Sequence, residues 1–314
     1  MKKLLFLLVL LFLAGCIKRE SLDTDKPYTL DPVDGDVIII YEDGYEAETF
    51  ATLTEEAELR GLLCREDDIL AVDMLGNKIL RFGYDGTLLE TIGVTGNGEG
   101  EFLNPLALAE HDGKLYLLDA GNLRIVVLNQ EFLMEKEISL QELGIHDFSS
   151  GDSSLAVLNE NAIFITSSYE NKAFLLKNQN ELLTLEENFY GVCTVGGGKA
   201  YVAQSVLVNG SIAETGKVFY AEYNEKEGLI KNQLPYFNSP RDLIVFGEDM
   251  YVLNGYYGAI ERCALNGDYK KTIYKFAKTL DDRTYLTHFA MDSEGNFYVY
   301  DNYNHVIKKV YKAK

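Results

Sequence analysis

The chain has 314 residues, of which 47% are hydrophobic and 25% charged, with 49 acidic against 29 basic side chains. This balance is typical of a globular protein and excludes wholesale disorder, collagen and coiled coils. The net charge of −20, without a basic stripe, also argues against a nucleic-acid partner.

The N-terminus has the pattern of an export signal. Lys2 and Lys3 precede an apolar run over residues 4–13, which is too short to span a bilayer and is typical of a signal peptide. The sequence LAGC that ends at Cys16 resembles the lipobox of bacterial lipoproteins, in which cleavage before the cysteine leaves that residue to carry a lipid. A simple cleavage site with a chance cysteine is the alternative.

We therefore predict a signal peptide over residues 1–15, a lipidated Cys16 and a polar tether to residue 35. We expect the lipid on Cys16 to attach the protein to a membrane. Ile17 stands where enterobacterial lipoproteins kept in the inner membrane have aspartate, which favours the outer membrane of the cell envelope and leaves the exposed side open. The other cysteines, Cys64, Cys193 and Cys263, are odd in number, and we expect free buried thiols or one disulfide with a leftover thiol.

Internal repetition dominates the rest of the chain. An apolar strand that ends in a polar residue recurs at 69–73, 115–119, 163–167, 200–204, 250–254 and 297–301, and a second apolar strand follows each. The repeat starts lie 37 to 50 residues apart, which is the size of a propeller blade. We predict an all-β, six-bladed β-propeller of four-stranded antiparallel blades over residues 36–314, with a monomeric body.

The last repeat is one strand short. The apolar stretch 36–41 precedes the first repeat without a partner, and we expect this N-terminal strand to pair with the last blade and close the ring.

Two segments of the second repeat resemble the NHL repeat of six-bladed propellers. Residues 96–105 read GNGEGEFLNP and residues 112–125 read DGKLYLLDAGNLRI, with Asp119, Asn122 and Arg124 at the repeat's polar positions. The sixth repeat matches more weakly, and Ser167 and Gln204 replace the aspartate in repeats three and four. Together with the lipobox, this resembles the propeller lipoproteins of Bacteroides-like bacteria. The resemblance implies a fold and leaves the activity open, because propellers serve as lectins, lyases, lactonases and interaction platforms.

Motifs for catalysis are few. The glycines at 96, 98 and 100 match neither a dinucleotide fingerprint nor a P-loop, and we expect them to form a flexible connection. Four histidines without metal-ligand spacing predict no metal site. No cofactor is predicted, although carboxylates or amides in the channel are the groups that could hold a divalent cation.

The register of the repeats indicates a possible site. Nine residues before each repeated strand stand Arg60, Leu106, Ser154, Gly191, Arg241 and His288, which should surround one mouth of the central channel. Arg60, Arg241 and His288 are the catalytic candidates, since they could converge on a carboxylate, a phosphate or a uronate. The alternative is that each arginine pairs locally with an acid, such as Asp242.

The same mouth should be aromatic, since the loops that open there contain many tyrosines, some of which must belong to the core. Flat rings of this kind hold sugars or extended peptides. The predicted ligand-binding residues are Tyr169, Tyr190, Tyr236, Tyr256, Tyr257, Tyr285 and Tyr303, and the insertion 205–216 lies on the same face.

These observations favour a membrane-anchored envelope lipoprotein without enzymatic activity, whose propeller binds a protein or glycan ligand through the aromatic face. The alternative is a hydrolase or lyase for a lactone or uronate-like substrate at the channel mouth. In that case Arg60 and Arg241 would stabilise a carboxylate, and His288 would act as general base.

Overall fold

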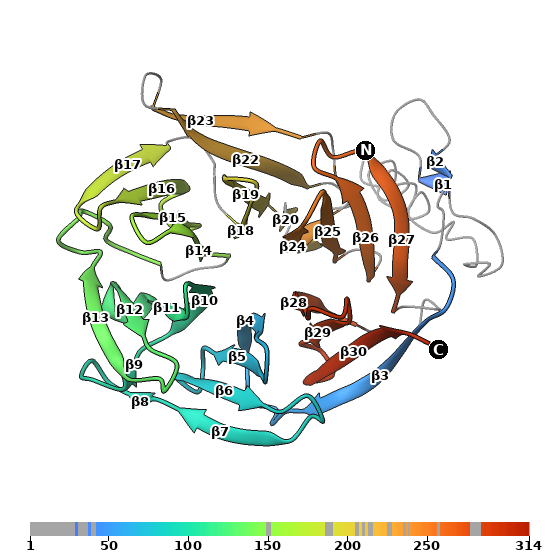
Figure 1. Cartoon of the computed structure of the whole chain (residues 1–314), viewed down its shortest axis with the longest axis horizontal. Helices are drawn as coiled ribbons and strands as arrows, with labels where there is room; N and C mark the ends of the chain where they lie inside the picture. Colours follow the sequence, from blue (N-terminus) through green and yellow to red (C-terminus); the bar gives the residue numbers. More distant parts are fainter. Residues whose placement is uncertain are drawn as a thin grey trace, which may run out of the picture.

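The computed structural model describes residues 29–30, 37–38, 42–148, 152–185, 191–204, 207–208, 211–212, 216–224, 228–234, 237, 239–255, 258–276 and 284–313. In this part of the chain, six antiparallel sheets of four strands each stand around a central axis (Figure 1). The fold is therefore the predicted all-β six-bladed propeller, and each of the six repeated segments forms the second strand of one blade.

The strands of each blade are given from the innermost outward. The first blade has β4 (Leu59–Cys64), β5 (Ile69–Asp73), β6 (Lys78–Phe82) and β7 (Leu88–Ile92), the second β10 (Pro105–His111), β11 (Lys114–Asp119), β12 (Arg124–Leu128) and β13 (Met134–Ser139), and the third β14 (Ser154–Asn159), β15 (Ala162–Ser167), β16 (Lys172–Lys177) and β17 (Glu181–Leu185). The fourth blade has β18 (Val192–Gly196), β19 (Lys199–Gln204), β22 (Lys217–Asn224) and β23 (Gly228–Gln233), the fifth β24 (Pro240–Phe246), β25 (Asp249–Asn254), β26 (Ala259–Ala264) and β27 (Tyr269–Lys275), and the sixth β28 (Leu286–Met291), β29 (Phe297–Asp301), β30 (Val306–Lys312) and β3 (Tyr45–Thr52). Shorter elements are the pairs β1 (Thr29–Leu30) with β2 (Val37–Ile38), β8 (Val94–Thr95) with β9 (Glu101–Phe102) and β20 (Leu207–Val208) with β21 (Ser211–Ile212), and the 3-10 helix η1 (Ala120–Asn122).

The hydrophobic core lies between the blades. Each of six apolar clusters combines side chains from two neighbouring blades; one of them packs Phe82 of the first blade with Tyr298 of the sixth. The middle strands β5 and β29 are buried at every residue because a blade covers each of their faces, which explains why they are apolar in both parities. The outermost strand β7 is mostly exposed.

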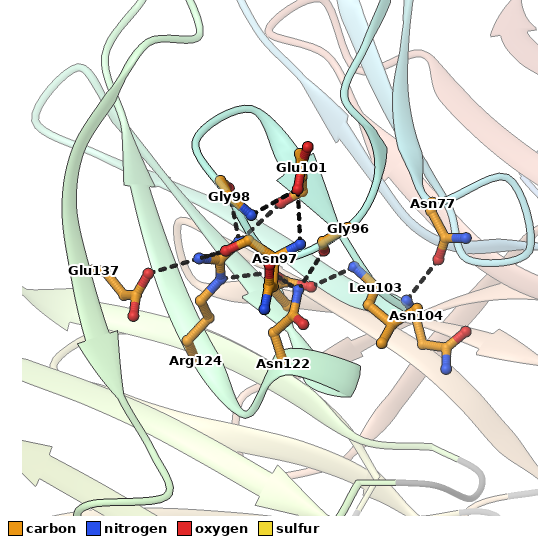
Figure 2. A network of polar contacts seen from close by, with 11 residues as sticks. Asn77, Gly96, Asn97, Gly98, Glu101, Leu103, Asn104, Asn122, Arg124 and Glu137 are labelled. Atoms are coloured by element: carbon orange, nitrogen blue, oxygen red, sulfur yellow. Dashed lines mark hydrogen bonds and ion pairs between the residues drawn. The ribbon is translucent and has the colours of Figure 1, made fainter.

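A buried arginine organises the NHL-like motif of the second blade (Figure 2). Arg124 donates hydrogen bonds to the carboxylates of Asp119 (2.7 Å) and Glu137 (2.6 Å). It also donates to the carbonyl oxygens of Asn97, Gly98 and Glu101 at 2.8–3.2 Å. Its side chain is only 6% exposed. The arginine thus fastens the connection from the first blade to the second blade.

The glycine-rich stretch is consequently an ordered loop rather than the flexible connection that the sequence analysis expects. The carboxylate of Glu101 accepts hydrogen bonds from the backbone N–H groups of Asn97 (3.0 Å) and Gly98 (2.8 Å). The Asn122 side chain donates to the carbonyl of Gly96 at 2.8 Å. Glycine is needed at position 96, where φ is +157° and a Cβ atom would lie 2.1 Å from the Glu101 carboxylate.

An N-terminal strand closes the ring, as predicted, but it is not the stretch 36–41. The closing strand is β3, which pairs antiparallel with β30 from Tyr45↔Lys312 to Thr52↔Val306, and Figure 1 shows the two side by side. In β3, Ala47 packs in the core while Glu46 and Glu48 are exposed, because the outermost strand has one face in solvent. Alternation, rather than a continuous apolar run, was therefore the signal for this strand. In the 36–41 stretch, β2 pairs instead with β1.

The predicted signal peptide, Cys16 and nearly all of the tether lie outside the described residues. No helix among the described residues is long and apolar enough to cross a membrane. Cys64, Cys193 and Cys263 are all free thiols, the last two buried and Cys64 half-buried, so the alternative with one disulfide is wrong.

Candidate functional site

The innermost strands all begin at one end of the propeller, which we call the mouth face; the opposite end is the far face. The second strand of each blade ends at the mouth face too, because it runs antiparallel to the first. The loops after β5, β11, β15 and β29 therefore share this face with the starts of the innermost strands. Between the strands runs a channel with a volume of about 250 Å³.

Four innermost strands begin with a β-bulge, in which one extra residue shifts the pairing; these residues are Arg60, Leu106, Arg241 and Thr287. A bulge redirects the extra side chain relative to its neighbours. Arg60 and Arg241 thus occupy equivalent places, as the count of nine residues predicts, but their equivalent in the sixth blade is Thr287. The count is wrong there because the turn between β28 and β29 is one residue longer than the turn between β4 and β5.

Arg60 lies between the channel and a neighbouring groove, and lines both. Its guanidinium forms an ion pair with Glu58 at 2.5 Å, and its Nε atom is buried without a hydrogen-bond partner. The side chain is 23% exposed, so a ligand can reach it. The pairing with Glu58 compensates its charge locally.

Arg241 is more buried than Arg60, with 8% of its side chain exposed. It lies 3.8 Å from the carboxylate of Asp152 and donates a hydrogen bond to the hydroxyl of Tyr285 at 3.2 Å. The guanidinium carbon stands 5.4 Å from the centre of the Tyr285 ring, within the range of a cation–π contact. Its Nε atom has no partner among the described residues.

His288 lies one residue further into the channel, which it lines together with Asp242. The Nδ1 atom of the imidazole is 3.5 Å from the Asp242 carboxylate and makes no hydrogen bond. Asp242 itself accepts hydrogen bonds from the backbone N–H groups of Leu243 (2.7 Å) and Phe289 (3.0 Å), which fix its orientation. The result is a carboxylate–imidazole pair across the boundary between the fifth and sixth blades.

The three candidates therefore stand on consecutive blades, since the ring closes between the sixth blade and the first. Each lies within 4 Å of a carboxylate. Only Arg60 pairs locally, with Glu58 two residues before it; the Asp152 carboxylate beside Arg241 comes from the connection to the third blade, and Asp242 beside His288 comes from the fifth. The sequence suggests Asp242 as the partner of an arginine rather than of His288, and it contains no signal for Glu58 or for Asp152, which reaches the mouth from the connection before β14.

A groove with a volume of about 440 Å³ adjoins the mouth and extends over the rims of the first two blades and the connection to the third. Its lining includes Arg60, Asn104, Leu106, His146 and Phe148. The volume falls in the usual range for small-molecule sites, about 300–1,000 Å³. The sequence gives no signal for this groove, because it is formed where the rims of two blades meet the connection to a third.

Three of the predicted ligand-binding tyrosines are described, and their side chains are exposed. The exposed fractions are 55% for Tyr169, 36% for Tyr285 and 53% for Tyr303, and all three stand in segments that open on the mouth face. Tyr190, Tyr236, Tyr256 and Tyr257 lie outside the described residues. Phe148 and Phe237, from loops of the same face, are buried and belong to the core. The insertion 205–216 contains the small hairpin of β20 and β21.

Metal binding finds no support in the described part of the chain, where no group of three or more His, Cys, Asp or Glu side chains is close enough together to hold an ion. What the mouth does offer is a set of hydrogen-bond donors beside carboxylate acceptors. Those donors and acceptors suit polar, uncharged groups or an imidazole-assisted proton transfer.

Comparison with known proteins shows similarity in fold alone. No family model matches the sequence, and no curated protein matches it. Among solved structures, an auxiliary nutrient binding protein from Bacteroides ovatus is 13% identical, with a TM-score of 0.60 over 87% of this chain and 78% of that chain. Virginiamycin B lyase from Staphylococcus aureus is 12% identical, with a TM-score of 0.53 over 85% of this chain and 99% of that chain.

The chain resembles these two proteins in fold. A Trichoderma reesei carbohydrate-active enzyme of family AA12 is similar too, at 12% identity and a TM-score of 0.54 over 88% of this chain and 98% of that chain. At such identities the likeness shows the propeller alone. One fold thus serves a binding protein and enzymes, and the function has to be argued from the mouth face itself.

Proposed function

We propose that this chain is a lipid-anchored protein of the bacterial outer membrane whose propeller binds a protein or glycan ligand on the mouth face. The observation that carries the proposal is the gathering of exposed tyrosines, a groove and a channel mouth on one face. Exposed aromatic rings beside polar groups supply contact area at a low cost in side-chain entropy. The anchor is the lipid on Cys16.

Binding is tested with residues 17–314, which contain every described residue, immobilised and exposed to envelope extract and to a glycan array. Replacing Tyr169 and Tyr303 by serine should reduce capture of the ligand at least tenfold. The matched control is Phe246→Ser: this side chain is 58% exposed and stands at the turn between β24 and β25 on the far face. Equal losses in both variants would refute a binding site on the mouth face.

The anchor is tested separately in cells. Cys16→Ser should move the protein from the membrane fraction to the soluble fraction and abolish labelling with radioactive palmitate. A protein that stays in the membrane after this substitution would contradict lipidation, without bearing on the mouth face.

A second function is favoured by the carboxylate–imidazole pair of Asp242 and His288. An imidazole beside a buried carboxylate is an arrangement in which the imidazole can serve as a general base. The candidate is a hydrolase or lyase acting on a lactone or uronate-like substrate, with Arg60 and Arg241 holding the substrate carboxylate. His288→Ala should then abolish turnover while His111→Ala, a surface substitution at the far end of β10, should not. Ligand capture without turnover by the natural protein would exclude this function.

A further inference from the structure

The mouth face contains polar side-chain atoms that are buried and unpaired. Among the described residues, seven buried nitrogen or oxygen atoms of side chains lack a hydrogen-bond partner. Five of them lie at the starts of β4, β24 and β28, on the three consecutive blades: Arg60 Nε, Ser239 Oγ, Arg241 Nε, Thr287 Oγ1 and His288 Nδ1. Leaving such a group unpaired costs about 1–3 kcal/mol. Their concentration at one place indicates that a ligand supplies the missing partners.

Every candidate cation at this place has a carboxylate beside it. Arg60 lies beside Glu58, Arg241 beside Asp152, and His288 beside Asp242. The chain as a whole has a net charge of −20. An incoming anion would meet a carboxylate next to each cation and a repulsive field from the whole protein, so a uronate or phosphate gains little here. The observed pairing therefore disfavours the anionic ligand that the sequence alone left open.

The same arrangement suits hydroxyl groups. A hydroxyl both donates and accepts, so two neighbouring hydroxyls can bridge a guanidinium donor and a carboxylate acceptor a few ångströms apart. Arg241 and Asp152 offer such a pair at 3.8 Å. Beside them Tyr285 is 36% exposed, with the guanidinium over its ring. An aromatic ring next to paired donors and acceptors is a surface for a sugar ring.

We infer that Arg241, Asp152 and Tyr285 form a subsite for a neutral sugar residue, from which the glycan continues along the groove that Arg60 shares with the channel mouth. This inference rests on the proposed binding function and specifies its ligand as an uncharged glycan. Thr287 and Arg60, at the equivalent bulge positions of the next two blades, supply further donors. Because the inferred ligand is uncharged, a higher salt concentration should not weaken its complex with the protein.

The test is isothermal titration of the purified protein with a panel of neutral oligosaccharides (gluco-, manno-, galacto- and xylo-tetraoses) and with tetragalacturonate, at 50 mM and 500 mM salt. We expect at least one neutral tetrasaccharide to bind, with a Kd that changes less than twofold between the two salt concentrations. Tetragalacturonate should bind at least tenfold more weakly. Tighter binding of tetragalacturonate, weakened by salt, would overturn the inference.

Asp152→Asn distinguishes the two ligand classes by the sign of its effect. A charged acceptor forms stronger hydrogen bonds than a neutral one, so the variant should bind the neutral sugar about tenfold more weakly. For an anionic ligand, loss of the carboxylate would instead raise the affinity. Asp152 is 23% exposed and asparagine is isosteric, so the variant should fold. Asp112→Asn, on a carboxylate that is 85% exposed in a turn of the far face, is the matched control and should change nothing.

The failures of the two proposals can be told apart. Capture of a protein on the mouth face with no response to any neutral tetrasaccharide would overturn the sugar subsite and leave the binding function standing. A neutral sugar that binds equally well to the Asp152→Asn variant and to the natural protein would likewise overturn the subsite. If no ligand is captured on the mouth face in the capture experiment, both the binding function and the sugar subsite are overturned.

Discussion

Arg124 provides the sharpest test of how this propeller is held together. The Arg124→Met substitution removes the charged donor and keeps a side chain of similar length. Among the described residues, the fully buried carboxylate of Asp119 then keeps hydrogen bonds from the Leu103 N–H (2.7 Å) and the Asn122 amide (2.8 Å). Removing one partner of a buried ion pair typically costs about 3–5 kcal/mol. Burial works against the charged form, but hydrogen bonds to Asp119 and Glu137 raise the pKa of Arg124, so the charge is present at every working pH.

We take about 4 kcal/mol as the expected loss, near the middle of that range. For a domain of this size, each kcal/mol lowers the melting temperature by about 2 °C, so the variant should melt about 8 °C below the natural protein. Thermal unfolding followed by circular dichroism measures this shift. The loop 96–101 should also open, so a protease specific for glutamate should cut at Glu99 in the variant first.

The matched control is Arg262→Met. Arg262 also pairs with an aspartate, Asp249, but 31% of its side chain is exposed and Lys270 also pairs with that carboxylate at 2.6 Å. Partly exposed ion pairs contribute about 0–1 kcal/mol, so this variant should melt within about 2 °C of the natural protein. If Arg124→Met melts no lower than Arg262→Met, the buried network around Arg124 does not stabilise the fold more than an exposed ion pair does.

Three further outcomes are expected. Deleting residues 42–52 removes β3 and should lower the melting temperature and cause aggregation, whereas deleting residues 17–36 should leave the melt unchanged; equal melts for both deletions would contradict closure by β3. Burial raises the pKa of Glu261 from 4.5 to about 7, although a hydrogen bond from Asn254 lowers it. Between these two pH values the folded protein holds a proton that the unfolded chain releases. The free energy of unfolding should therefore fall as the pH rises from about 4.5 through 7. Glu261→Gln should therefore be about 3 kcal/mol more stable than the natural protein at pH 8 and equal to it at pH 4, as measured by urea unfolding; the same difference at both pH values would refute the assignment. Without reductant, Cys64, Cys193 and Cys263 should all react with maleimide in 6 M guanidinium, while Cys193 and Cys263 should not react in the folded protein; a mass that shows fewer than three reactive thiols would indicate a disulfide.

The architecture could be predicted because propeller blades repeat a simple physical pattern. A strand covered on both faces is apolar in both parities, and segments such as 69–73 and 297–301 show this without any alignment. The closing strand escaped because β3 alternates between core and solvent, so its hydrophobicity is that of an ordinary surface strand. A search for apolar runs selects residues 36–41 instead.

The candidate site was predictable in part. Counting along the repeats gives the bulge residues Arg60 and Arg241, since the paired residues Leu59↔Asp73 and Pro240↔Asn254 are equally far apart in the sequence. One additional residue in the turn before β29 was enough to misplace the count onto His288, and only the paired backbone reveals Thr287. Glu58 precedes Arg60 by two residues, but the acids beside Arg241 and His288 come from other segments, and contacts between segments distant in the sequence cannot be inferred from the spacing within a repeat.

The direction of β3 bears on the proposed lipid anchor, since it sets the face of the propeller from which such an anchor would extend. The strand begins at Tyr45, beside the end of β30 on the far face, and runs towards the mouth face, where Thr52 pairs with Val306. A lipid attached upstream of β3 would therefore pull on the far face. The propeller would rest with that face towards the bilayer and hold its tyrosines and groove outward, where large ligands can approach without steric hindrance from the lipid headgroups.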